Sequence, residues 1–170
     1  MKKLSLFILA QIILLLSLSC DSPENVYSID GYFEAYFPGQ PSLFSSRDDE
    51  FQTYVMYNYN DEYEDISYVA LYSILKKTPE DNKNFLYNYI YLMIEGWGGN
   101  LLKYEQIEHE GNDEILYVTE SERANQLVYE FGVAAIKDNT LYQWVVEERE
   151  DMIKADKIFG EKLKFFKVLH

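Results

Sequence analysis

Side chains that commonly act as nucleophiles, general bases or metal ligands are scarce in this sequence. It contains one cysteine, Cys20, and two histidines, of which His170 is the last residue. A serine or cysteine triad needs a histidine base, and a zinc-protease helix needs a second histidine four positions after the first. Asp113 stands four positions after His109. We therefore exclude the zinc-protease helix and expect His109, which acids flank, to be an exposed side chain without a catalytic role.

Carboxylates are abundant, and two clusters of them are candidates for cation binding: Asp48-Asp49-Glu50 and Asp61-Glu62-Tyr63-Glu64-Asp65. Calcium prefers several carboxylate oxygens, but neither cluster has the Asp-x-Asp-x-Asp-Gly spacing that wraps a loop around the ion. We expect solvated turns, with no bound metal and no cofactor. A catalytic carboxylate pair has no recognisable pattern among 29 acidic residues, so a hydrolase stays open as an alternative.

Tyrosine is the other candidate for chemistry, here the chemistry of recognition, since 16 residues are tyrosine. Tyrosine beside acid is typical of binding surfaces because it provides contact area at a low cost in side-chain entropy. The alternative is that these rings belong to the core and the sheet. The predicted binding surface consists of Tyr57, Tyr59, Asp61, Glu62, Tyr63, Glu64 and Asp65.

The net charge of -14 restricts the classes of partner. Binding to nucleic acid depends on Lys and Arg that neutralise phosphates, and the sequence has no basic patch, so we exclude nucleic acid. Direct adhesion to anionic lipid headgroups is disfavoured for the same reason. A cationic protein would be attracted, within the reach that salt allows. The alternative is that the charge only keeps the protein soluble.

The N-terminal segment has the pattern of a signal peptide. Met1-Lys2-Lys3 is basic, and residues 4–18 are mostly apolar. This run is shorter than the roughly 20 residues of a membrane-spanning helix, and its length and flanks fit the apolar part of a secretory signal. It ends in Ser17-Leu18-Ser19-Cys20, and polar residues follow.

This ending resembles the lipobox of bacterial lipoproteins, with small Ser19 directly before Cys20. The resemblance implies that Cys20 carries the lipid and becomes the first residue of the mature protein. The protein would then be exported and lipid-anchored to a membrane of the bacterial cell envelope. The alternative is ordinary cleavage after Ser19, which would release a soluble protein with a free N-terminal thiol.

The predicted organisation is a signal peptide over 1–19, a lipidated N-terminus and tether over 20–30, and one α+β domain over 31–170. A helix with Thr78 as its N-cap is expected to end near Trp97 and to bury Leu86, Ile90, Met93 and Trp97. A last helix should begin within 147–151, where acids suit a helix N-terminus, and carry Met152, Ala155, Phe159, Leu163 and Phe166. Strands are predicted at 32–37, 51–59, 66–75, 101–108, 114–119, 126–136 and 141–146.

The fold class follows from how these strands are patterned. Tyr142, Trp144 and Val146 alternate with Leu141 and Val145, so the strand is apolar on both faces. Such a sheet should be covered on both sides. We therefore expect a mostly antiparallel sheet of about six or seven strands, with one helix after the third strand and one at the C-terminus.

This arrangement resembles the PsbP-like α/β/α sandwich over about residues 29–169. The resemblance rests on Phe37-Pro38-Gly39-x-Pro41 after the first strand, on Asn139-x-Leu141-Tyr142, and on Phe159 with the Phe165-Phe166 pair. It implies a non-enzymatic module, because known members dock onto protein assemblies that include a photosystem and a small GTPase of nuclear transport.

The function expected from the sequence is therefore a non-enzymatic, membrane-anchored binding or accessory module that acts on another protein of the envelope. Two alternatives stay open. One is an inhibitor or immunity protein that neutralises a cationic hydrolase. The other is an envelope hydrolase that uses carboxylates.

Overall fold

The computed structural model describes residues 25–149 and 151–169, so Cys20 and the segment before it lie outside the described residues. The N-terminal half contains five strands and one helix: β1 (Val26–Ile29), β2 (Phe33–Tyr36), β3 (Ser42–Asp48), β4 (Gln52–Asp61), β5 (Ile66–Leu75) and α2 (Asn82–Gly96). The C-terminal half contains β6 (Asn100–His109), β7 (Asn112–Arg123), β8 (Gln126–Lys137), β9 (Thr140–Arg149), α3 (Met152–Lys162), the 3-10 turn η1 (Leu163–Phe165) and β10 (Lys167–Val168).

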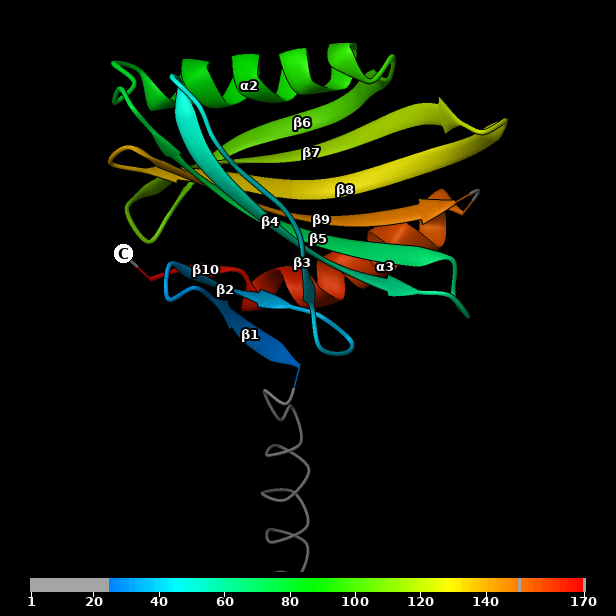
Figure 1. The fold of residues 1–170 in the computed structure, drawn as a ribbon. Coiled ribbons are helices and arrows are strands. Elements are labelled where there is room, and N and C mark those ends of the chain that lie inside the picture. Colours follow the sequence, from blue (N-terminus) through cyan, green and yellow to red (C-terminus); the bar gives the residue numbers. More distant parts are fainter. Residues whose placement is uncertain (1–24, 150, 170) are drawn as a thin grey trace, which may run out of the picture.

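The strands form two antiparallel sheets. Seven strands make the large sheet, in the order β3-β4-β5-β9-β8-β7-β6, and β1-β2-β10 make a small one. Helix α2 lies over one face of the large sheet, while α3 and the small sheet lie on the other face (Figure 1). The mostly antiparallel sheet is as predicted, and within it β4 and β5 form a hairpin and β6 to β9 form a meander.

Each face of the large sheet has its own hydrophobic core. The core on the α3 face is the larger, and Trp144 and Phe33 are fully buried in it, with Phe159 of α3 stacked on Trp144. The core on the α2 face contains Leu86 and Ile90, as predicted, together with Ile94. Met93 is only half-buried and Trp97 is 51% exposed.

Helix α2 follows the fifth strand and not the third, because two strands were not predicted. Val26–Ile29 lies in the segment expected to be a tether, and its four residues form β1 by pairing with β2. Ser42–Asp48 is a mostly exposed edge strand, and it lies between the strands predicted at 32–37 and 51–59. The pairing of a polar edge strand depends on its neighbour, so its own hydrophobic pattern does not identify it.

Both helices begin later than predicted. Asp81 caps α2, its carboxylate accepting a hydrogen bond from the Asn84 N–H at 3.0 Å, and Thr78 is exposed before the helix. Strand β9 continues to Arg149, so Glu147 and Glu148 belong to a strand and not to a helix start. Phe166 follows α3 and η1, yet it is buried in the α3-face core. Within residues 25–149 and 151–169, neither helix has the length and apolarity to cross a bilayer.

Candidate functional site

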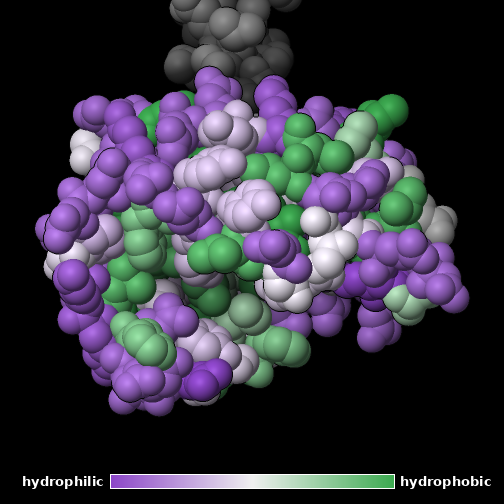
Figure 2. All heavy atoms as spheres, turned by 90° about the horizontal axis from the view of Figure 1, so that it is seen from above, coloured by the Kyte–Doolittle hydropathy of each residue, from purple (hydrophilic) through white to green (hydrophobic). Residues whose placement is uncertain are grey.

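A cleft of about 660 Å³ opens on the α2 face of the large sheet. Helix α2 packs mainly on β6, β7 and β8. The cleft lies beside the helix on the same face, with α2 on one side and edge strand β3 on the other. Figure 2 looks down on this face and shows hydrophobic residues gathered in a hollow that hydrophilic residues border.

The floor of the cleft consists of rows of residues that lie opposite one another on neighbouring strands. Such cross-strand partners project from the same face of a sheet. One row is apolar at its centre, where Val69 of β5 pairs with Val145 of β9. The row on one side of it contains Met56, Leu71 and Gln143, and the row on the other side contains Asn60, Ser67, Glu147, Glu130 and Thr119.

A glycine in the floor sets the position of its most buried tyrosine. Tyr117 of β7 lies opposite Gly132 of β8, and its ring packs so closely on Gly132 that a Cβ there would overlap it. The Tyr117 hydroxyl accepts a hydrogen bond from Gln143 Nε2, and burial raises the pKa of Tyr117 well above its ordinary value.

One wall of the cleft is a stripe on α2. Tyr89, Met93 and Trp97 all line the cleft, and their spacing of four residues places them on one side of the helix. The Tyr89 hydroxyl donates to Gln143 Oε1 at 3.4 Å, and Gln143 Nε2 lies 3.6 Å from Met93 Sδ. Gln143 thus connects the helix to the floor, and burial raises the pKa of Tyr89 to about 12.

The opposite wall is the β3 edge, where a β-bulge directs Phe44 toward the cleft. The pairing shifts between Leu43, opposite Tyr57, and Ser45, opposite Met56. Phe44 is the extra residue, so it and Ser45 face the same side, and its ring lines the cleft at 66% exposure. Bulges are common where a strand must redirect a side chain beside a site.

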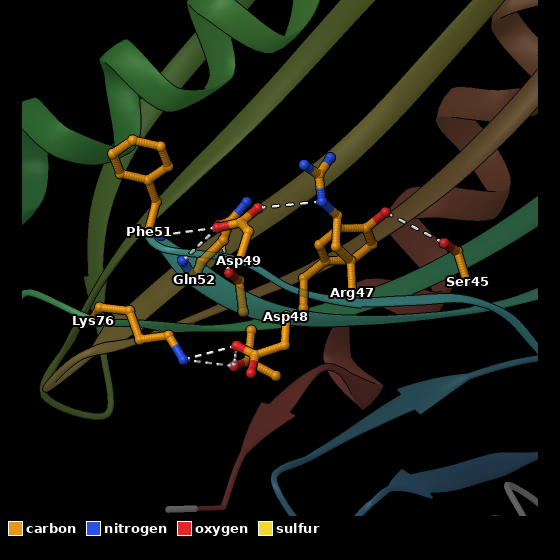
Figure 3. A network of polar contacts seen from close by, with 10 residues as sticks. Ser45, Arg47, Asp48, Asp49, Phe51, Gln52 and Lys76 are labelled. Carbon is orange, nitrogen blue, oxygen red and sulfur yellow. Dashed lines mark hydrogen bonds and ion pairs between the residues drawn. The ribbon is translucent and has the colours of Figure 1, made fainter.

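Polar contacts fix the β3–β4 turn that supports this wall (Figure 3). The Asp49 carboxylate accepts hydrogen bonds from the backbone N–H groups of Gln52 and Phe51, both at 2.9 Å. These bonds lower the pKa of Asp49. Lys76 Nζ lies 2.7 Å from Asp48 Oδ1, and this bond lowers the pKa of Asp48. The two aspartates of the first acidic cluster thus hold a turn together.

A charged group closes one end of the cleft. Arg123 of β7 forms ion pairs with Glu130 of β8 and, at 2.6 Å, with Glu147 of β9. Its guanidinium also lies 5.3 Å from the centre of the Trp97 ring, within the range of a cation–π interaction. Arg123 therefore pairs with two carboxylates, and its contact with Trp97 connects the floor of the cleft to the C-terminal end of α2.

Glu130 is the most buried member of this group, with 4% of the residue exposed. Burial raises the pKa of Glu130, while Arg123 acts in the opposite direction. Both of its carboxylate oxygens accept hydrogen bonds, Oε1 from Arg123 and Oε2 from Thr119 Oγ1 at 3.0 Å. Glu147 is engaged through Oε2 alone among the described residues, and 19% of its side chain is exposed.

The residues of the predicted tyrosine surface fall into two groups. Tyr57 and Tyr59 are half-buried on the α3 face, where the Tyr57 hydroxyl donates to Asp30 Oδ1 at 2.9 Å and the Tyr59 ring packs on Gly39. Asp61, Glu62, Tyr63, Glu64 and Asp65 form the end of β4 and the β4–β5 turn. Tyr63 is 99% exposed, and this turn directly follows Asn60 of the cleft.

The second acidic cluster is held by a hydrogen bond within the turn and by an ion pair with α3. Asp61 Oδ1 accepts from the Tyr63 N–H at 3.1 Å, and Glu64 pairs with Lys154 of α3 at 2.7 Å. Over the described part of the chain, no three His, Cys, Asp or Glu side chains are grouped as metal ligands would be. His109 lies 3.4 Å from Glu114 and is more than half exposed.

The residues of the cleft were not predicted as a site. Glu147 was predicted to lie at the start of the last helix, where acids suit a helix N-terminus, and Arg123 fell between the strands predicted at 114–119 and 126–136. The signal that could have identified them is polarity at every second position of an apolar strand, as in Gln143 and Glu147 of β9. Glu130, an acid between Tyr129 and Phe131, carries the same signal.

Comparisons with known proteins place the fold. No protein-family model matches the sequence, and no curated protein matches it. The chain is similar to the solved structure of cyanobacterial PsbP (CyanoP) from Synechocystis sp. PCC 6803. That comparison has 12% identity and a TM-score of 0.60, and covers 84% of this chain and 91% of that one. The chain thus has the PsbP-like fold predicted from its sequence.

A second similar structure is a protein of unknown function from Pseudomonas aeruginosa, at 11% identity and a TM-score of 0.44, covering 72% of this chain and 93% of that one.

Proposed function

We propose that this protein is a non-enzymatic binding module of the bacterial cell envelope, anchored through a lipid on Cys20, and that the cleft on the α2 face binds a segment of another protein. The observation that carries the proposal is the cleft beside α2, whose floor contains the apolar residues Val69, Leu71 and Val145.

The residues that line the cleft are of types that bind the apolar side chains of another protein. The walls provide aromatic and thioether side chains, namely Phe44, Met56, Tyr89, Met93 and Trp97. Methionine adapts its shape to irregular apolar partners, and aromatic residues are enriched at the centres of protein interfaces. The cleft opens to solvent between a helix and an edge strand, and this favours an extended segment over an enclosed small molecule.

An envelope hydrolase that uses two carboxylates has one observation in its favour, since Glu130 and Glu147 both line the cleft. Such an enzyme needs one carboxyl group to protonate a leaving group and the other to attack or activate water. Here Arg123 forms ion pairs with both carboxylates, and both oxygens of Glu130 are hydrogen-bonded within the protein. These contacts favour recognition over acid–base chemistry.

Site-specific photocrosslinking in cells tests the cleft as the binding site. A photoreactive amino acid replaces Met93, which lines the cleft, or its neighbour Leu92, which is 63% exposed and does not line it. We expect a discrete adduct from position 93 and none from position 92. The adduct should disappear when Phe44 is changed to Asp on the opposite wall, and mass spectrometry then identifies the partner. Equal labelling from both positions would remove the basis of the proposal.

The lipid anchor is tested separately. Labelling with a radioactive fatty acid should mark the wild-type chain and should leave Cys20→Ala unlabelled. The mature wild-type protein should fractionate with membranes, and mass spectrometry should find Cys20 as its acylated first residue. An intact N-terminal methionine in a cytosolic fraction would contradict the anchor without bearing on the cleft.

A further inference from the structure

We propose that the charged end of the cleft selects a basic side chain, so that the bound segment has a lysine or arginine next to aliphatic or aromatic residues. This inference rests on the proposed function and specifies its partner. It also specifies where each part of the segment lies. The apolar side chains would lie over Val69 and Val145, and the basic one beside Glu147.

The first argument is the charge balance among the residues that line the cleft. Glu130, Glu147 and Arg123 are the charged ones, so this end carries one more negative than positive charge. A partly buried charge is stabilised by an opposite charge with good hydrogen-bond geometry. Glu147 has a free oxygen, Oε1, within the described residues, and its neighbour Ser67 presents a hydroxyl on the same face.

The second argument is the charge around this end. Asn60 and Ser67 line the cleft and lie next to the end of β4 and the β4–β5 turn, a segment that contains Asp61, Glu62, Glu64 and Asp65. Only Lys154 forms an ion pair with these four acids in the described part of the chain. Arg149, opposite Val128 in the next row of the sheet, adds one positive charge, and the acids still outnumber the basic groups.

The third argument is the position of the charged end beside the apolar floor. The register places Glu147 two residues from Val145 on the same face of β9, and Ser67 two residues from Val69 on β5. Side chains two apart on a strand are roughly 7 Å apart. Neighbouring side chains of one extended segment, apolar and then basic, would reach both subsites together. A ligand with a single charge or a single apolar group would use half of the cleft.

The test is calorimetric titration of the purified domain with two synthetic peptides. Both peptides have leucine and phenylalanine followed by one more residue, which is arginine in one peptide and its neutral isostere citrulline in the other. We expect the arginine peptide to bind roughly ten- to a hundredfold more tightly, the range of a charge-assisted hydrogen bond. Glu147→Gln should reduce this preference about tenfold. Glu161→Gln removes the same charge from the exposed part of α3 and should leave the preference unchanged.

The outcomes separate the two proposals. Binding that Met93→Arg abolishes but that does not distinguish arginine from citrulline would overturn the basic subsite and keep the cleft. Binding that Met93→Arg does not affect would overturn the cleft as the site. If Glu147→Gln and Glu161→Gln reduce the preference for the arginine peptide equally, that preference arises from the overall charge of the protein and not from the cleft. Equal affinity for a medium-chain alkylammonium would reassign the site from a protein segment to a small amphiphile.

Discussion

Gly132 has a role that depends on the absence of a side chain. The Tyr117 ring occupies the place of a Cβ at this position, and its hydroxyl hydrogen-bonds Gln143, which also contacts Tyr89 and Met93 of α2. A Cβ at position 132 would therefore displace the Tyr117 ring. Through the Gln143 side chain, this shift would also disturb the contacts between the cleft floor and α2.

Gly132→Ala should lower the free energy of unfolding by about 1–3 kcal/mol, because overpacking forces the Tyr117 ring to move. Urea denaturation measures the change. Gly160→Ala is a matched control, since nothing lies within 4 Å of a Cβ there and the residue is inside α3. That control should stabilise the protein by about 0.5–1 kcal/mol. A neutral Gly132→Ala would mean that Tyr117 does not pack on Gly132.

The raised pKa of Glu130 makes the stability of the protein depend on pH. Its pKa is raised in the folded protein, so the native state binds the proton more tightly than the unfolded state does. Its contribution to the free energy of unfolding is therefore greatest below the unfolded pKa of about 4.5 and declines as the pH rises through the raised value.

Urea denaturation of wild type and Glu130→Gln at a series of pH values checks this sign. The stability of wild type relative to Glu130→Gln should fall as the pH rises above about 4.5. The opposite slope would mean that Arg123 outweighs burial and lowers the pKa of Glu130. Glu161→Gln should show no such slope, because Glu161 is exposed on α3.

At the scale of the elements, helix α2 has two candidate N-cap residues, Thr78 and Asp81. Thr78 followed by proline and acids has the sequence of a helix start, yet Asp81 makes the capping hydrogen bond. Asp81→Ala should lower the free energy of unfolding by about 0.5–2 kcal/mol, the usual effect of losing a cap. Thr78→Ala, tested by the same denaturation experiment, should have almost no effect. The reverse ranking would move the start of the helix to Thr78.

The sequence was sufficient for those elements whose residues have a strong pattern of their own. Strands β5, β8 and β9 are apolar on both faces and were predicted within a few residues, as was the end of α2 at Trp97. Strands β1 and β3 were missed because short or polar edge strands are determined by the strand they pair with. The cleft was missed because it combines six strands and a helix, and only the register brings these residues together.

At the scale of the whole molecule, the large sheet separates two hydrophobic cores, and the cleft lies on the face of only one of them. The α3-face core is completed by the small sheet and by Phe159, whereas the cleft lies on the other face. The two buried clusters have no residue in common. A substitution in one cluster should therefore leave the other largely unchanged as long as the protein folds.

Phe159→Ala tests this separation. It removes a ring that stacks on Trp144 with centroids 5.5 Å apart, and should lower the free energy of unfolding by about 3–5 kcal/mol. Affinity for the arginine peptide, measured at a temperature where the variant is folded, should not change. Ile153→Ala on the same helix, at an 80% exposed position, should alter stability by less than about 0.5 kcal/mol. Lost peptide affinity in folded Phe159→Ala would show that the two faces are coupled.

The place where the chain enters the fold has a consequence for how the protein would sit on a membrane. Strand β1 begins at Val26, six positions after Cys20, and belongs to the small sheet on the face opposite α2 (Figure 1). Six residues span at most roughly 20 Å. With Cys20 acylated, the α3 side would be held close to the bilayer and the open side of the large sheet would point outward. The short segment between Cys20 and Val26 would then determine which way the cleft faces relative to the membrane.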